Sequence, residues 1–191
     1  MPPRLVVIFG LIASGKTTLA RRLQERLGWP VIHSDQVRKA LAGIPATQRV
    51  QVPFGQGLYA PEMSGRTYAE MFRQAQAYLQ QGLSVILDGS FMRAADRQQA
   101  RDVAWQNGAQ IFFLLCQCSE AETRRRLRLR AANQQAMSDG REEILAAQQA
   151  RFEPVTDLAG LPFLAVATDQ PVEAVLAEVL AFLEQNANGR E

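Results

Sequence analysis

The stretch GLIASGKT at residues 10–17 decides the fold of this 191-residue chain. A continuous apolar run at residues 5–9 precedes it, as expected of a strand that is buried on both faces of a sheet. Residues 17–27 follow it with a leucine at every fourth position, Leu19, Leu23 and Leu27, which is typical of an amphipathic helix. A tight, glycine-containing turn between a buried strand and a helix is the first part of a strand-helix-strand unit, whose strands are parallel.

The same stretch matches the pattern G-x-x-x-x-G-K-[ST], which binds phosphate groups. Its glycines allow the backbone N–H groups to face phosphate oxygens, and the following helix directs its partial positive charge at them. We expect Lys16 to reach the β- and γ-phosphates of a nucleotide and Thr17 to ligate Mg²⁺. The residues expected to bind the nucleotide are Gly10, Ala13, Ser14, Gly15, Lys16, Thr17 and Thr18.

Outward from this motif, strand-like and helix-like segments alternate along the chain. Further strands are predicted at residues 30–33, 85–87, 111–116 and 163–167. Helices are predicted at residues 35–41, 61–81, 94–106, 119–132, 142–152 and 172–183. The alternation predicts a three-layer α/β fold of the P-loop NTPase type, with a doubly wound, parallel, five-stranded sheet in a single domain over residues 1–191. Residues 43–58 lack periodicity, and because such long loops are usually functional, we expect this loop to border the site.

The composition describes an ordinary globular chain, with 47% hydrophobic and 21% charged residues. Its 21 basic and 19 acidic residues leave a net charge of +2, too small for a dedicated nucleic-acid coat, so nucleic acid is a disfavoured partner. No apolar run approaches the ~18 residues of a membrane span. Cys116 and Cys118 lie in one apolar run and are expected to be reduced, structural thiols, which indicates a cytoplasmic protein.

Two other classes of protein that share this motif do not match the remaining residues of the chain. Guanine is commonly read by an Asn-Lys-x-Asp segment, but neither Lys16 nor Lys39, the two lysines of the chain, follows an asparagine. ATP is therefore expected to bind in preference to GTP. Motor-type ATPases need a catalytic carboxylate after the third predicted strand, yet no glutamate follows Asp88. The small kinases remain, and they need a base for the acceptor hydroxyl and arginines for the transferred phosphoryl group.

Acidic residues follow two of the predicted strands at the edge where open α/β sheets bind ligands. Asp35 comes just after the second strand, and Arg38 lies one helical turn later on the same face, either as part of a site or as a helix cap with a surface ion pair. Asp88 ends the third strand, where it binds Mg²⁺ through water, holds the acceptor, or only shapes a turn. Ser90 and Arg93 follow at the same edge, whereas His33 is expected to be structural.

Five arginines crowd one predicted helix, and such like charges cost stability unless anionic partners are present. We interpret residues 124–140 as a lid whose Arg126 and Arg130 face phosphates, with a solvated, salt-bridged face as the alternative. The adenine is expected to pack between this helix and residues 168–171. The five arginines are Arg124, Arg125, Arg126, Arg128 and Arg130.

The residues so far resemble a known family, the bacterial P-loop kinases often labelled AAA-domain ATP-binding proteins, which group with the kinase domain of phage polynucleotide kinase. Zeta toxins, gluconate kinase and chloramphenicol phosphotransferase are more distantly similar. The resemblance is carried by residues 10–17, 34–39, 59–63 and 87–91 and by Arg126 with Arg130.

The resemblance implies that Asp35 is the general base, that Arg38 contacts the acceptor or the transferred phosphate, and that Arg126 and Arg130 are lid arginines. It also implies that residues 43–66 and 90–97 determine the acceptor, whose identity the sequence leaves open. We therefore expect an ATP- and Mg²⁺-dependent kinase that phosphorylates a hydroxyl of a small molecule. The alternatives are a 5′-hydroxyl polynucleotide kinase and a non-catalytic ATP-binding module that regulates a partner.

Overall fold

The computed structural model describes residues 1–48, 55–132 and 142–187, and it contains every predicted strand in one sheet. All pairs in this sheet are parallel, and the strand order is β2-β3-β1-β4-β5. The doubly wound fold is therefore confirmed. The strands are β1 (Arg4–Phe9), β2 (Val31–His33), β3 (Val85–Asp88), β4 (Gln110–Gln117) and β5 (Phe163–Ala167).

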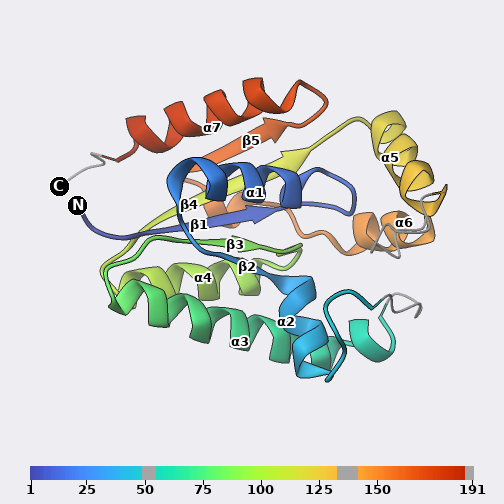
Figure 1. Cartoon of the computed structure of the whole chain (residues 1–191), viewed down its shortest axis with the longest axis horizontal. Coiled ribbons are helices and arrows are strands. Elements are labelled where there is room, and N and C mark those ends of the chain that lie inside the picture. Colours follow the sequence, from blue (N-terminus) through green and yellow to red (C-terminus); the bar gives the residue numbers. More distant parts are fainter. Residues whose placement is uncertain (49–54, 133–141, 188–191) are drawn as a thin grey trace.

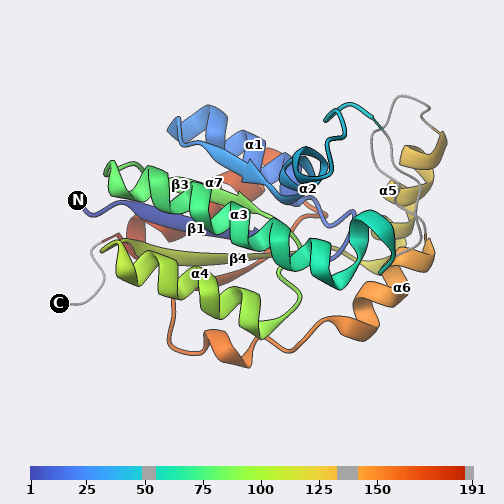
Figure 2. The same cartoon turned by 90° about the horizontal axis from the view of Figure 1, so that it is seen from below.

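Helices cover both faces of the sheet and make the three layers (Figure 1). The helices are α1 (Lys16–Leu27), α2 (Ser34–Leu41), α3 (Pro61–Gln80), α4 (Ala94–Gln106), α5 (Glu120–Ala132), α6 (Glu142–Arg151) and α7 (Val172–Gln185). α1 and α7 lie on one face and α3 and α4 on the other, while α2, α5 and α6 gather beyond the carboxyl ends of the strands (Figures 1 and 2). Within the described part of the chain, no helix combines the length and apolar character needed to cross a membrane.

The central strand β1 explains why two cores form. Its side chains alternate between the faces of the sheet. Leu5, Val7 and Phe9 pack with α3 and α4, whereas Val6 and Ile8 pack with α1 and α7. All five are fully buried, as expected of a parallel strand with neighbours on both edges.

The two cysteines are free, as predicted. Cys116 is buried in β4, and burial raises the pKa of its thiol to about 12. A thiol with so high a pKa is an inert core side chain. Cys118 is only partly buried, and its Sγ lies 2.9 Å from the Thr123 hydroxyl.

A buried arginine joins the loop after β3 to the segment after α6. Arg97 of α4 has no solvent exposure, and its guanidinium donates to both carboxylate oxygens of Asp157, at 2.9 and 2.6 Å. It also donates to the carbonyls of Phe91, at 3.0 Å, and Pro154, at 2.8 Å. One side chain therefore holds α4 and the loop before it to a segment that lies 57 to 60 residues further along the chain.

The Arg97–Asp157 pair should contribute strongly to stability. Donation by Arg97 lowers the pKa of Asp157 from its ordinary value, so the pair stabilises the fold above pH ~4 and loses that contribution as the pH falls further. Asp157→Asn leaves a buried charge without its counterion, which costs about 3 kcal/mol in the free energy of unfolding at pH 7. Urea unfolding at pH 7 and at pH 3 measures this difference, which should shrink at the lower pH.

Glu70→Gln is the matched control, because Glu70 accepts two hydrogen bonds from Arg73, both at 2.7 Å, on an exposed face of α3. Exposed pairs contribute little, so this variant should unfold close to the wild type. Equal losses in the two variants would show that burial of Arg97 does not determine the strength of its pair.

Candidate functional site

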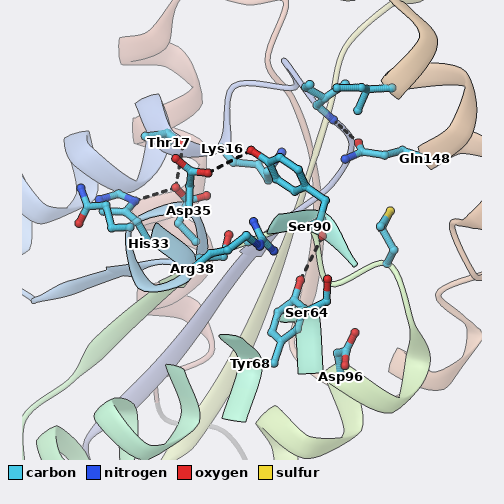
Figure 3. Close-up of a pocket in the computed structure, with 18 of the residues that line it drawn as sticks. Lys16, Thr17, His33, Asp35, Arg38, Ser64, Tyr68, Ser90, Asp96 and Gln148 are labelled. Carbon is cyan, nitrogen blue, oxygen red and sulfur yellow. Dashed lines mark hydrogen bonds and ion pairs between the residues drawn. The ribbon is translucent and has the colours of Figure 1, made fainter. Parts of the chain in front are cut away.

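A cavity of about 830 Å³ opens at the carboxyl ends of β1, β2 and β3. It is enclosed by the phosphate-binding loop (residues 10–17), the start of α2, the loop after β3, and side chains of α3 and α6 (Figure 3). The predicted site residues that line it are Ala13, Gly15, Lys16, Thr17, Thr18, Asp35, Arg38 and Asp88. Both lysines of the chain, Lys16 and Lys39, line this cavity.

The phosphate-binding loop has the backbone shape that its glycines allow. Gly10 has a φ of +136° and Gly15 a φ of +89°, a region that side chains disfavour. A Cβ on Gly10 would collide with the carbonyl oxygen of Cys116 on the neighbouring strand. Ala13 adopts a φ of +61° in the same loop. The Lys16 ammonium folds back and donates to the Leu11 carbonyl at 2.6 Å.

Asp88 links the phosphate-binding loop to β2. The Thr17 hydroxyl donates to Asp88 Oδ2 at 2.7 Å, and Nδ1 of His33 lies 2.8 Å from the same oxygen. Asp88 is buried at the end of β3, and β-sheet pairing places it directly beside His33. The structure brings together Thr17 and Asp88 as expected. It also gives His33, which was expected to be structural, a contact with this carboxylate.

Magnesium prefers hard oxygen ligands, and this corner of the cavity offers them in the Thr17 hydroxyl and the Asp88 carboxylate. The residues present therefore fit Mg²⁺, with nucleotide phosphates as further ligands. His33 could have been associated with this corner only through the register of β2 with β3, which sequence periodicity does not report.

Asp35 and Arg38 both line the cavity from α2 but do not pair with each other. The Asp35 carboxylate is 49% exposed, lies 3.1 Å from Nζ of Lys39, and accepts from the Tyr59 hydroxyl at 3.5 Å. Arg38 is only 9% exposed, and its guanidinium lies 5.0 Å from the centre of the Tyr59 ring. The alternative of a surface ion pair between Asp35 and Arg38 is therefore wrong.

A buried tyrosine of α3 that was not predicted as a site residue holds the loop after β3. Tyr68 of α3 accepts a hydrogen bond from the Phe91 N–H at 2.9 Å, and its hydroxyl lies 3.0 Å from Ser90 Oγ. Burial raises the pKa of Tyr68 above its usual value, so the hydroxyl stays protonated at neutral pH. Phe91 has a φ of +40°, so a strained turn presents Ser90 to the cavity.

Acidic side chains of the first helical turn pair with three arginines of α5. Arg124 pairs with Glu120 at 2.7 Å, and Arg125 and Arg126 pair with Glu122 at 2.6 and 2.7 Å. These ion pairs agree with the alternative of a salt-bridged face for Arg124 and Arg125. Arg125 and Arg126 lower the pKa of Glu122 to about 2.

Arg126 contacts the phosphate-binding loop and the turn after β5. Its guanidinium donates to the carbonyls of Ala13, at 3.2 Å, and Thr168, at 2.6 Å. Arg130 belongs to the last turn of α5, but its side chain lies outside the described part of the chain, as do residues 133–140 of the predicted lid and residues 49–54 of the predicted acceptor segment.

α6 touches the phosphate-binding loop directly. Oε1 of Gln148 accepts a hydrogen bond from the N–H of Ile12 at 2.7 Å (Figure 3). Gln148 could not be predicted as a site residue, because a glutamine on a helix carries no signal of a distant backbone partner.

The profile of a family described as AAA domain matches residues 5–155 of this chain. An uncharacterized protein of Mycobacterium tuberculosis is 33% identical over 148 residues, which cover 78% of this chain and 29% of that protein. The chain thus spans less than a third of the length of this relative.

Two solved structures show the same fold. A gluconokinase from Sinorhizobium meliloti superposes with a TM-score of 0.67 at 22% identity, covering 97% of this chain and 94% of that one. The APS kinase of Mycobacterium tuberculosis, solved with AMPPNP and APS, superposes with a TM-score of 0.68 at 18% identity, covering 96% and 98%. At these identities, the likeness concerns the fold.

Two glycine-to-alanine substitutions should change stability in opposite directions. Gly10→Ala places a Cβ against the Cys116 carbonyl in a disfavoured backbone conformation, which should cost about 2 kcal/mol or more. Gly65→Ala, in the exposed part of α3 with open space around its Cβ position, should stabilise by about 0.5–1 kcal/mol. Thermal unfolding of both variants measures the effect. A Gly10→Ala protein as stable as the wild type would contradict the loop geometry.

Proposed function

The chain belongs to the AAA domain family, and from this premise we propose that it is a kinase that transfers the γ-phosphoryl group of ATP to a hydroxyl of a small molecule. The observation that carries the proposal is the content of one cavity. Lys16 and Thr17 of the phosphate-binding loop and the half-exposed carboxylate of Asp35 line the same space, so a bound nucleotide and a base share it. The likeness in fold to a gluconokinase and an APS kinase supports this reading.

The phosphate-binding loop and α1 form the nucleotide end of the cavity. Gly10 and Ser14 shape the loop from behind, while Ala13, Gly15, Lys16, Thr17 and Thr18 face the phosphates. The Thr17 hydroxyl, with Asp88 beside it, would hold Mg²⁺, which supplies positive charge to the phosphate oxygens when bound.

Asp35 is the proposed base at the acceptor end. Its carboxylate takes the proton of the acceptor hydroxyl as the hydroxyl oxygen forms a bond to the γ-phosphorus, while the bond to the β-γ bridging oxygen breaks and ADP leaves. Lys39 and Tyr59 hold the carboxylate at the cavity wall, which fixes the direction from which the acceptor approaches.

Arginines supply the remaining charge in this proposal. Arg38 lines the acceptor end, and Arg126 lies against the phosphate-binding loop, close to Gly15 and to the space proposed for the phosphates. Guanidinium donors aimed at the transferred group stabilise transition-state charge. The lid role of Arg126 and Arg130, the preference for ATP over GTP, and the single domain over residues 1–191 remain predictions.

The intact set of Lys16, Thr17 and Asp35 favours an enzyme over a non-catalytic nucleotide-binding module, because such a module has no need of a base beside the phosphate-binding loop. The chain covers 29% of its mycobacterial relative. The activity of that longer protein therefore does not follow from the site described here.

Lys16→Ala should abolish stabilisation by nucleotide. Saturating ligand at about 100 times its Kd stabilises a protein by ~2.7 kcal/mol, and the loss of the ammonium removes a main contact with the β- and γ-phosphates. Thermal unfolding with and without ATP and Mg²⁺ measures this shift. Arg21→Ala is the control, since Arg21 lies on the same helix with its side chain 65% exposed, and it should keep the full shift. An unchanged thermal shift by ATP and Mg²⁺ in Lys16→Ala would contradict nucleotide binding at the phosphate-binding loop.

Asp35→Asn should retain nucleotide binding and lower phosphoryl transfer by about 10²- to 10⁴-fold, because the amide has nearly the same shape but accepts no proton. The measurement is ADP release that depends on an added hydroxyl acceptor, with the thermal shift by ATP measured alongside. Asp102→Asn, on α4 away from the cavity, is the control and should transfer normally. Transfer at the wild-type rate in Asp35→Asn would leave Asp35 with a structural role alone.

A further inference from the structure

Helix α6 holds one peptide group of the phosphate-binding loop. The N–H of Ile12 donates to Oε1 of Gln148 at 2.7 Å. The carbonyl of the same peptide group, which belongs to Leu11, accepts from the Lys16 ammonium at 2.6 Å. A side chain 136 residues beyond Ile12 is therefore joined, through a single peptide group, to the lysine that is expected to reach the β- and γ-phosphates.

The contact with Ile12 fixes the direction of the Gln148 amide. A backbone N–H only donates, so the amide atom that meets it is the oxygen, and Nε2 points elsewhere. Nε2 carries two N–H donors, and it has no hydrogen-bond partner among the described residues. Gln148 reaches from α6 toward the phosphate-binding loop and lines the cavity (Figure 3), so these two donors are left for a ligand in the cavity.

The charge of Lys16 strengthens the donors of Gln148. Donation by the ammonium to the Leu11 carbonyl makes the N–H of Ile12 a stronger donor, and this N–H in turn polarises the Gln148 amide in the same direction. An ammonium has three donors, so its contact with the Leu11 carbonyl is compatible with contacts to phosphate oxygens. Nε2 is therefore suited to an anionic oxygen.

α6 is anchored to both ends of the cavity. Leu145 is buried in one apolar cluster with Ala13 of the phosphate-binding loop. Just beyond the helix, Oε2 of Glu153 accepts from the N–H of Ala94 at 2.6 Å, at the start of α4. Gln148 lies on the helix between these two contacts, so its amide is held in place by the fold.

The position of Gln148 favours the terminal phosphate of a bound nucleotide. Gly15 lies beside Thr168, next to residues 168–171, where the adenine is expected. Gln148 instead contacts the loop at Ile12, and its helix leads on to the acceptor end of the cavity. The phosphate that lies nearest to the acceptor is the one to be transferred, the γ-phosphate.

We propose that Gln148 donates from Nε2 to an oxygen of the γ-phosphate, so that the protein distinguishes a nucleoside triphosphate from a diphosphate. This inference rests on the proposed kinase function for the identity of the ligand. Gln148 keeps its hydrogen bond to a non-bridging oxygen while the phosphoryl group moves to the acceptor. ADP has no oxygen at this position and leaves without that contact.

The test compares the Kd of AMPPNP with the Kd of ADP, both measured calorimetrically with Mg²⁺. Gln148→Met has a similar length but neither donor nor acceptor. AMPPNP should lose about ten-fold or more in affinity relative to ADP, because a hydrogen bond to a charged group is lost. The ratio of the two constants is the readout, since a weakened loop would affect both nucleotides alike.

Two further substitutions separate the donor from the acceptor of the amide. Gln148→Glu still accepts from the Ile12 N–H but has no donor for phosphate, so its ratio should fall at least as far as that of Gln148→Met. A wild-type ratio in Gln148→Glu would show that support of the loop is the whole role of this side chain, and it would overturn the proposal.

Gln149→Met and Gln149→Glu are the matched controls, because Gln149 is the exposed neighbour of Gln148 on α6. Both should leave the ratio unchanged, since an exposed side chain makes no contact with the nucleotide. Equal falls in the variants of Gln148 and Gln149 would mean that no specific contact is involved and would overturn the proposal.

The outcomes distinguish this inference from the kinase proposal. Equal weakening of AMPPNP and ADP in Gln148→Met, or no weakening of either, overturns the contact with the γ-phosphate and leaves the kinase intact. A ratio that falls in the variants of Gln148 alone, without phosphoryl transfer to any acceptor, supports the contact and counts against the kinase. A wild-type protein that binds neither nucleotide contradicts both.

Discussion

The pairing of β3 with its two neighbours is the constraint on which the site depends. Asp88 stands beside Ile8 of β1 and beside His33 of β2 in the same register. Parallel strands in this register end at one edge, so the phosphate-binding loop, the start of α2 and the loop after β3 emerge together. Because side chains alternate across a sheet, a slip of one residue would turn Asp88 away from Thr17 and His33. Because the strands on either side are buried, such a slip would cost free energy of folding.

From this edge the cavity divides into two chemically different ends. At the nucleotide end, steric contact restricts the loop sequence, because the carbonyl of Cys116 leaves no room for a side chain at residue 10. At the acceptor end a strained turn at Phe91 is clamped by Tyr68 on its N–H and by Arg97 on its carbonyl. The structure has rigid walls where groups must be positioned, and Arg38 lines the acceptor end as a guanidinium whose buried Nε has no hydrogen-bond partner.

The elements of the fold could be predicted from the sequence because each has strong local periodicity. β1, for example, is a continuous apolar run followed by a glycine motif, and the structure places that strand at residues 4–9. Asp35 and Asp88 could be placed at the sheet edge for the same reason, since each follows a predicted strand. His33, Tyr68 and Gln148 could not be assigned, because their contacts depend on strand register or on partners 55, 23 and 136 residues away.

The proposed reaction in this cavity is the transfer of a phosphoryl group from ATP to a hydroxyl. Phosphorus NMR of the protein with ATP, Mg²⁺ and a panel of hydroxylated small molecules observes every phosphorus species at once. We expect a new phosphomonoester resonance that grows in step with ADP and requires the acceptor. Inorganic phosphate as the sole new product, or ATP that stays intact with every acceptor, would contradict it.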